Sequence, residues 1–251
     1  MRFRKNIFMP FAVLGDPNHK QSFEIIKTLI DSGAGALELG FAFSDPIADG
    51  PVIQRANKRA LAGGITTSKA FHILEEVRNY SSIPISLMLS FNIMYQYGIE
   101  KFYKRCSELQ IDAVLCPDIP LEESGELIDS ARNHHINQVF IVSQTTNRER
   151  MMRLNNVCSG YFYLVSLLGT TGIRDNLDSD LQFLIKKTKD RTSLPVYVGF
   201  GISNPEHVRN VIRYGADGAI CGSAICRLIE SNLDDFVKMK DEISRFSNKM
   251  K

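Results

Sequence analysis

The stretch LIDSGAGALEL, residues 29–39, joins an amphipathic helical pattern to a short apolar run. Two other stretches repeat this junction, CSELQIDAVLC at 106–116 and VIRYGADGAIC at 211–221. In the first and the third, Gly33 or Gly215 stands where a helix C-cap requires a positive φ, and an apolar run follows directly. The junction therefore predicts helices that lead straight into buried strands at several points along the chain.

Eight short apolar runs carry this alternation through the whole chain. They are rich in β-branched or aromatic residues and almost continuously apolar, which is typical of strands buried on both faces of a parallel sheet. The runs lie at 7–14, 36–41, 84–89, 112–116, 138–143, 161–166, 195–199 and 217–221. Amphipathic segments separate them without a linker. Eight strand–helix units in 251 residues predict a single (β/α)₈ barrel domain over 1–251. A doubly wound open sheet is the alternative.

Composition argues against several classes of function. The 30 basic and 28 acidic side chains give a net charge of +2, which provides no electrostatic case for nucleic-acid binding. No apolar stretch approaches the roughly 20 residues that a membrane span needs. The N-terminal MRFRKNIFMPFAVLG fits a buried first strand better than a signal peptide. The five cysteines form no CxxC pair, which predicts reduced thiols in a cytoplasmic protein, and the absence of an HExxH motif predicts no metal site.

The stretch ALELGFAFSDPIADG, residues 36–50, places one carboxylate inside an expected strand and two in the loop after it. An unpaired buried carboxylate is costly, or its pKa rises until the group is protonated. Glu38 is therefore either a structural acid bonded to a neighbouring strand or a general acid/base in an apolar pocket. Asp45, which precedes Pro46, fits a turn. Asp49 is freer to point into a cleft, and spacing alone leaves its role open.

Glycine-containing stretches follow the last three expected strands. They are GTTG at 169–172, GFGIS at 199–203 and CGSAI at 221–225. Glycine lets backbone N–H groups approach an anion closely, and a helix N-terminus adds a favourable dipole. Because the last loops of such barrels commonly hold a phosphate, the three stretches together predict a phosphate site at one corner of the barrel.

The chain resembles the tryptophan synthase alpha chain family. The resemblance rests on PFAVLGDP (10–17), LELGFAFSDPIADGP (37–51), FGIS (200–203) and GSAI (222–225), in the family's order over essentially the whole chain. It implies a (β/α)₈ barrel and a carbon–carbon or carbon–oxygen lyase that cleaves indole-3-glycerol phosphate to indole and glyceraldehyde 3-phosphate. It also implies no metal or cofactor in this chain, and a beta-chain partner that carries pyridoxal phosphate in an α₂β₂ complex.

The resemblance also assigns the residues of the site. It implies that Glu38 is the general acid/base and that Asp49 hydrogen-bonds the N–H of the indole ring, while Asp45 stays structural. Residues of a second group would contact the substrate: the walls beside the indole, a tyrosine near Glu38, a lid threonine and the phosphate loops. These are Phe11, Tyr163, Thr171, Gly172, Phe200, Gly201, Gly222 and Ser223.

Several positions depart from the family's pattern. Ala42 replaces a usual proline, Ser90 replaces a common tyrosine beside the indole pocket, and the leucines at 167–168 make the sixth loop more apolar. The helix that normally precedes the first strand is nearly absent, so we expect the barrel bottom to be less covered. The loops at 42–52 and 167–180 are expected to be the most mobile segments of the free chain. The alternative functions are a weakly catalytic or non-catalytic regulatory subunit and a phosphosugar isomerase.

Overall fold

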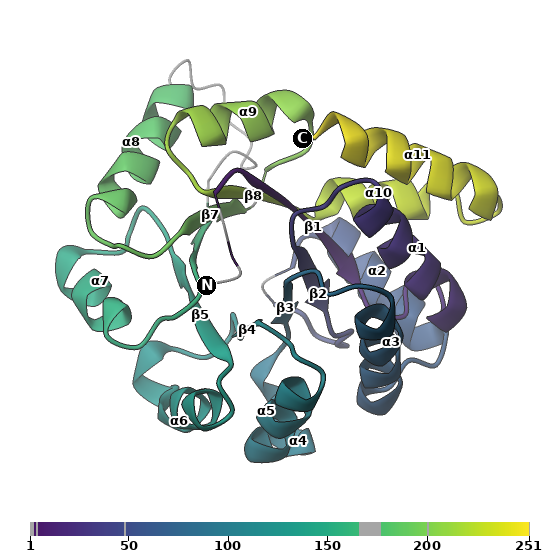
Figure 1. Cartoon of the computed structure of the whole chain (residues 1–251), viewed down its shortest axis with the longest axis horizontal. Coiled ribbons are helices and arrows are strands. Elements are labelled where there is room, and N and C mark those ends of the chain that lie inside the picture. Colours follow the sequence, from purple (N-terminus) through teal and green to yellow (C-terminus); the bar gives the residue numbers. More distant parts are fainter. Residues whose placement is uncertain (1–2, 4, 48, 166–176, 200, 251) are drawn as a thin grey trace.

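A closed barrel of parallel strands forms the centre of the molecule (Figure 1). The computed structural model describes the whole chain except residues 1–2, 4, 48, 166–176, 200 and 251. Within the described residues each strand pairs with the next along the chain, and the last pairs with the first. The strands are β1 (Ile7–Val13), β2 (Leu37–Gly40), β3 (Ile85–Met88), β4 (Ala113–Leu115), β5 (Asn137–Val142), β6 (Phe162–Val165), β7 (Val196–Gly199) and β8 (Gly218–Cys221). This topology confirms the (β/α)₈ barrel and excludes the open sheet.

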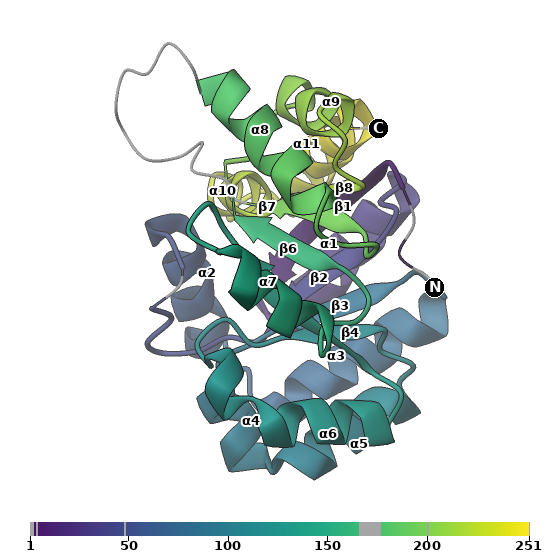
Figure 2. The same ribbon diagram turned by 90° about the vertical axis from the view of Figure 1, so that its left-hand side faces the viewer.

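Helices surround the barrel, and Figure 2 shows it from the side, with α8 and α9 at one edge and α4 to α6 at the other. Those in the described part of the chain are α1 (His19–Asp31), α2 (Pro51–Ala62), α3 (Thr67–Tyr80), α4 (Phe91–Tyr97), α5 (Ile99–Glu108), the 3₁₀ turn η1 (Leu121–Glu123), α6 (Gly125–Asn133), α7 (Arg148–Asn155), α8 (Leu177–Lys189), α9 (Pro205–Arg213), α10 (Ser223–Glu230) and α11 (Phe236–Lys249). None of these described helices is long and apolar enough to cross a membrane.

The helix-to-strand junctions take the backbone conformation that the sequence pattern predicts. Gly33 and Gly215 have φ values of +86° and +101°, and the next strand begins a few residues later. The junction before β4 uses the same left-handed conformation at Gln110, with φ of +52°, and His135 does so before β5, with φ of +59°. The same turn therefore also forms at residues other than glycine, for which the left-handed conformation is sterically unfavourable.

Side chains along each strand alternate between the helical layer and the barrel interior, as parallel strands require. On β2, Leu37 and Leu39 pack into the core between sheet and helices, so Glu38 between them points into the barrel. The register places Glu38 beside Phe11 on β1 and Ser86 on β3. The strand thus holds a carboxyl group at a fixed position inside the barrel.

Phe3 fills the N-terminal end of the barrel interior. Its side chain is buried, and its ring meets the rings of Tyr161 and Tyr197 edge-on, with centroid distances of 5.0 and 6.1 Å. The two tyrosine rings stack on each other at 4.7 Å. One aromatic side chain therefore fills part of the barrel bottom, where the short N-terminal segment leads us to expect less cover.

Candidate active site

Glu38 is the buried acid of the candidate site, with 1% of its surface exposed. Burial and, to a lesser extent, the nearby charge of Asp49 raise the pKa of Glu38 to about 8, while the hydroxyl of Tyr161 lowers it by hydrogen bonding. Glu38 therefore carries its proton at neutral pH. Its Oε1 atom has no hydrogen-bond partner among the described residues, and a purely structural acid would be expected to have one.

Asp49 lies in the loop between β2 and α2, just before the helix begins. The Nδ2 of Asn57 donates a hydrogen bond to the Oδ2 of Asp49 at 3.0 Å, and the backbone N–H of Asp49 donates to the carbonyl of Pro46 at 3.1 Å. Partial burial raises the pKa of Asp49, and the bond from Asn57 offsets part of that rise. The loop thus presents a fixed, partly desolvated carboxyl group.

Asn57 is a residue of the site that sequence reasoning missed. It is buried on α2, where its Oδ1 accepts a bond from the N–H of Phe43 at 3.1 Å. Its Nδ2 donates both to Asp49 and to the carbonyl of Ile53, at 3.0 and 3.1 Å. One amide therefore ties the β2–α2 loop to the helix. The signal was an asparagine in the apolar stripe of PVIQRANKRALA, one turn before the buried Ala60.

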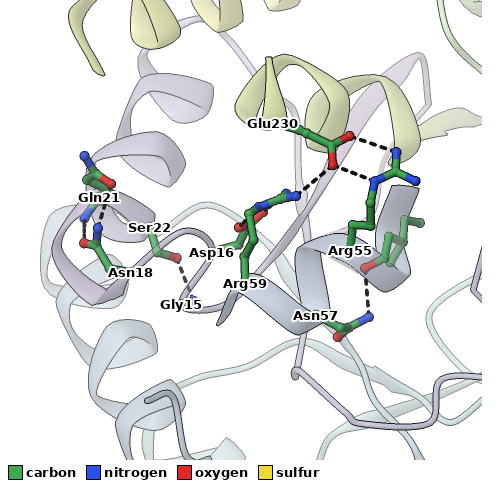
Figure 3. A network of polar contacts seen from close by, with 10 residues as sticks. Gly15, Asp16, Asn18, Gln21, Ser22, Arg55, Asn57, Arg59 and Glu230 are labelled. Atoms are coloured by element: carbon green, nitrogen blue, oxygen red, sulfur yellow. Dashed lines mark hydrogen bonds and ion pairs between the residues drawn. The ribbon is translucent and has the colours of Figure 1, made fainter. Parts of the chain in front are cut away.

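Charged side chains fix α2 against the loop after β1 and against α10 (Figure 3). Arg59 donates from Nε and Nη2 to the two carboxyl oxygens of the buried Asp16, each at 2.8 Å. The Oε1 of Glu230 accepts from Arg59 Nη1 at 3.1 Å and from Arg55 Nε at 2.6 Å. The helix that carries Asn57 is therefore held in place by ion pairs with two other segments.

Asp49 lines a cleft at the carboxyl ends of the first four strands. Phe11 and Met88 contribute to its apolar wall, and Ser90 and Asp118 give it a polar edge. The hydroxyl of Ser90 donates to the Oδ2 of Asp118 at 2.5 Å. The serine that departs from the family's common tyrosine therefore adds a hydrogen-bonded polar group to the cleft rather than an aromatic wall.

Tyr163, for which the resemblance implies a place near the acid/base, is acted on by the charges of both Glu38 and Asp49. It is buried on β6, and its pKa is raised well above the ordinary value by burial first and then by the charges of Glu38 and Asp49. A Cβ on Gly199 of β7 would lie 2.0 Å from the Tyr163 hydroxyl oxygen. Only glycine at this position leaves room for the tyrosine.

Three of the expected phosphate-binding residues lie around the ends of β7 and β8. Gly201 has φ of +79°, and Gly222 lies so near Phe11 that a Cβ would stand 3.3 Å from its ring. Ser223 begins α10, and the N–H groups of a first helical turn have no partner within the helix, which suits an anion. Phosphate binding at these residues stays a prediction. The expected residues outside the described part of the chain are Thr171, Gly172 and Phe200, together with the loop leucines Leu167 and Leu168.

The cysteines do not belong to the candidate site. All five are buried and unpaired, and burial raises the pKa of each thiol. A protonated buried thiol is a poor nucleophile. In the described part of the chain no three His, Cys, Asp or Glu side chains gather as metal ligands do. The chemistry of the site is best explained by Glu38 and Asp49.

Comparison with known proteins identifies the family. The sequence family described as the tryptophan synthase alpha chain matches residues 1–251. The chain belongs to this family. Tryptophan synthase alpha chains of Methanothermobacter thermautotrophicus and Methanoregula boonei are 47% and 44% identical to it, over 97% and 98% of this chain and 90% and 93% of theirs. The tryptophan synthase complex of Pyrococcus furiosus contains a chain of similar structure, with a TM-score of 0.89, 32% identity and coverage of 99% of this chain and 98% of that one.

Membership in the tryptophan synthase alpha chain family confirms the resemblance read from the sequence motifs. It makes the chain a lyase of tryptophan biosynthesis. Asp49 lies in the loop after the carboxyl end of β2, the side of the barrel on which enzymes of this fold carry catalytic groups, and Glu38 lies within that strand and points into the barrel.

Proposed function

We propose that the chain cleaves indole-3-glycerol phosphate to indole and glyceraldehyde 3-phosphate, with Glu38 as the proton carrier. The observation that supports this most directly is the pair of carboxyl groups with different surroundings. Glu38 is sealed in the barrel with a pKa of about 8, whereas Asp49 borders the cleft and accepts a bond from Asn57. Such a pair provides an acid and a carboxylate at the same pH.

In the proposed reaction Glu38 both donates a proton and recovers one, so its protonation state is the same at the end as at the start. Protonated Glu38 gives its proton to C3 of the indole ring, and the positive charge spreads to the ring nitrogen. Asp49, as a carboxylate near the ring N–H, stabilises that charge. The newly ionised Glu38 then takes the proton of the hydroxyl on the adjoining carbon. The carbon–carbon bond breaks, its electrons return to the ring, and Glu38 is again protonated.

The rest of the proposed site positions the substrate. Gly201, Gly222 and Ser223, with Gly172, would bind the phosphate through backbone N–H groups. Phe11 would contact the indole, since it lies between the cleft and the N-terminus of α10. Every proton transfer is assigned to a side chain, so we propose that the reaction requires no cofactor of this chain.

Indole release from indole-3-glycerol phosphate, measured as kcat/KM against pH, tests this proposal. We expect a bell-shaped profile that rises as Asp49 ionises, above the usual range for an aspartate, and falls near pH 8 as Glu38 loses its proton. Because Glu38 and Asp49 interact, the two limbs report pKa values of the pair and not of either residue alone. The substrate phosphate, with its second pKa at about 6, can also change the rate on the acid side of the profile. The alkaline limb is therefore the decisive one. No indole release would refute the function, and a flat profile from pH 7 to 9 would refute the proton roles.

We also propose that a beta chain binds this chain in an α₂β₂ complex in the cytoplasm and supplies pyridoxal phosphate there. One solved relative is described as showing mutual activation in the α₂β₂ complex of Pyrococcus furiosus. In the present chain Ile47, in the loop that carries Asp49, has 85% of its surface exposed, and Tyr95 on α4 has 63%. Large apolar side chains exposed beside a cleft support a docking face there.

Replacing Ile47 by aspartate is expected to weaken activation by the beta chain, measured relative to the variant's own basal rate of indole release because Ile47 also lines the cleft. The charge would have to be desolvated when the partner docks, so the beta-chain concentration for half-maximal activation should rise about tenfold or more. The measurement is steady-state indole release titrated with beta chain. Phe183→Asp is the matched control, because this residue is 68% exposed on α8, across the barrel from β2. Equal titrations for the two variants would place the partner elsewhere.

A further inference from the structure

A buried pair of hydroxyl groups lies next to Glu38. The Oγ of Ser86 and the hydroxyl of Tyr161 are 2.9 Å apart, and both residues have 0% of their surface exposed. Ser86 stands directly beside Glu38 in the β2–β3 register. We propose that Ser86 is a positioning residue that acts on Glu38 through Tyr161, with the two hydroxyls forming a hydrogen-bond chain that reverses direction when Glu38 gains or loses its proton.

Counting protons along the chain supports this inference. Tyr161 has one hydroxyl proton, and burial holds its pKa well above the ordinary value, so that proton is retained. An ionised Glu38 only accepts, so Tyr161 donates to the carboxylate and its oxygen can then accept only from Ser86. A protonated Glu38 can donate to the Tyr161 oxygen instead, and the tyrosine proton then points to Ser86. The hydroxyl oxygens of Tyr161 and Ser86 thus keep a hydrogen-bond partner in both protonation states of Glu38.

The surroundings hold this chain in place. The ring of Tyr161 stacks on Tyr197 with an interplanar angle of 21° and meets Phe3 edge-on, so its hydroxyl has a fixed direction. The titratable groups that act on Glu38 are Asp49 from the β2–α2 loop and Tyr161 and Tyr163 from the β6 segment. Its register neighbour on β1 is Phe11, which does not titrate. Ser86 is therefore the part of the surroundings that can change the donor strength of Tyr161 without adding a charge.

The test rests on the proposed function and uses the alkaline limb of kcat/KM for indole release by the full chain. Tyr161→Phe removes a bond that favours ionised Glu38, so the limb should move up by about one pH unit. Ser86→Ala removes the hydroxyl that donates to Tyr161 and so weakens the bond from Tyr161 to Glu38. Because cooperative bonds change by roughly 10–30%, the alkaline limb of this variant should shift by about 0.3 unit in the same direction. The double variant should shift no further than Tyr161→Phe, because Ser86 acts through the tyrosine.

Ser124→Ala is the matched control, since this serine is equally buried and donates to the carbonyl of Leu121, away from Glu38. The alkaline limb of kcat/KM for Ser124→Ala should coincide with that of the wild type. Additive shifts in the double variant, or an unmoved limb in Tyr161→Phe or Ser86→Ala, would overturn the proposal. These outcomes differ from a failure of the proposed function, in which the wild-type chain itself would release no indole.

Discussion

Replacing Glu38 by glutamine is expected to lower indole release by about 10²–10⁴-fold, the usual cost of removing a positioned acid/base. The amide has nearly the same shape, but it can neither deliver a proton to C3 of the ring nor accept one from the hydroxyl. KM should change little, since the variant keeps the cleft and the phosphate loops. The measurement is steady-state turnover of the purified variant, with circular dichroism to show that the barrel is folded.

Stability provides the control for this variant. The pKa of Glu38 rises from an ordinary 4.5 to about 8 in the folded chain, so folding binds its proton more tightly. The stability from this group is fully present below pH 4.5 and is lost as pH rises through about 8. The glutamine variant has no titrating group at this position. The difference between its unfolding temperature and that of the wild type should therefore shift in favour of the variant as pH increases from 4.5 to about 8. Wild-type turnover, or a variant that unfolds at neutral pH, would contradict the assignment.

The strands were predictable from the sequence because both faces of each are buried. Every predicted strand boundary lies within one residue of the observed one; the run at 217–221, for example, becomes Gly218–Cys221. A strand that packs against helices outside and side chains inside has little freedom in composition, so the apolar run marks its ends. The carboxylate inside one such run, Glu38, was equally visible, since burial of a charge is costly.

The remaining features depend on contacts between residues distant in sequence. Phe3 is buried in the barrel bottom because its ring meets the stacked rings of Tyr161 and Tyr197, more than 150 residues along the chain. Asn57 is identified as a partner of Asp49 only when the β2–α2 loop folds back onto its helix. Likewise, Gln110 adopts a positive φ without the glycine that signals such a turn. The proton on Glu38 follows from the same three-dimensional burial.

Replacing Asp49 by asparagine is expected to lower indole release by about 10²–10³-fold, the scale found when a group that stabilises transition-state charge is removed. The amide can still accept the bond from Asn57 through its own oxygen, so the loop should keep its shape. The negative charge that faces the ring nitrogen is lost, and kcat should fall more than KM changes. Asp45→Asn is the control: among the described residues this exposed carboxylate accepts a side-chain bond only from the Ser44 hydroxyl, at 2.6 Å, and its variant should keep its turnover within about twofold.

Asn57→Ala separates the charge of Asp49 from its placement. The variant keeps the carboxylate but removes the bond that lowers the pKa of Asp49, so the acid limb of kcat/KM should move to higher pH. It also leaves the N–H of Phe43 without its acceptor, which frees the loop. Turnover relative to the wild type should therefore recover part of its loss as pH rises along the acid limb, where Asp49 becomes ionised in both proteins. An Asp49→Asn variant within threefold of wild type, or an Asn57→Ala defect that stays constant along the acid limb, would show that this carboxylate does not stabilise the ring charge.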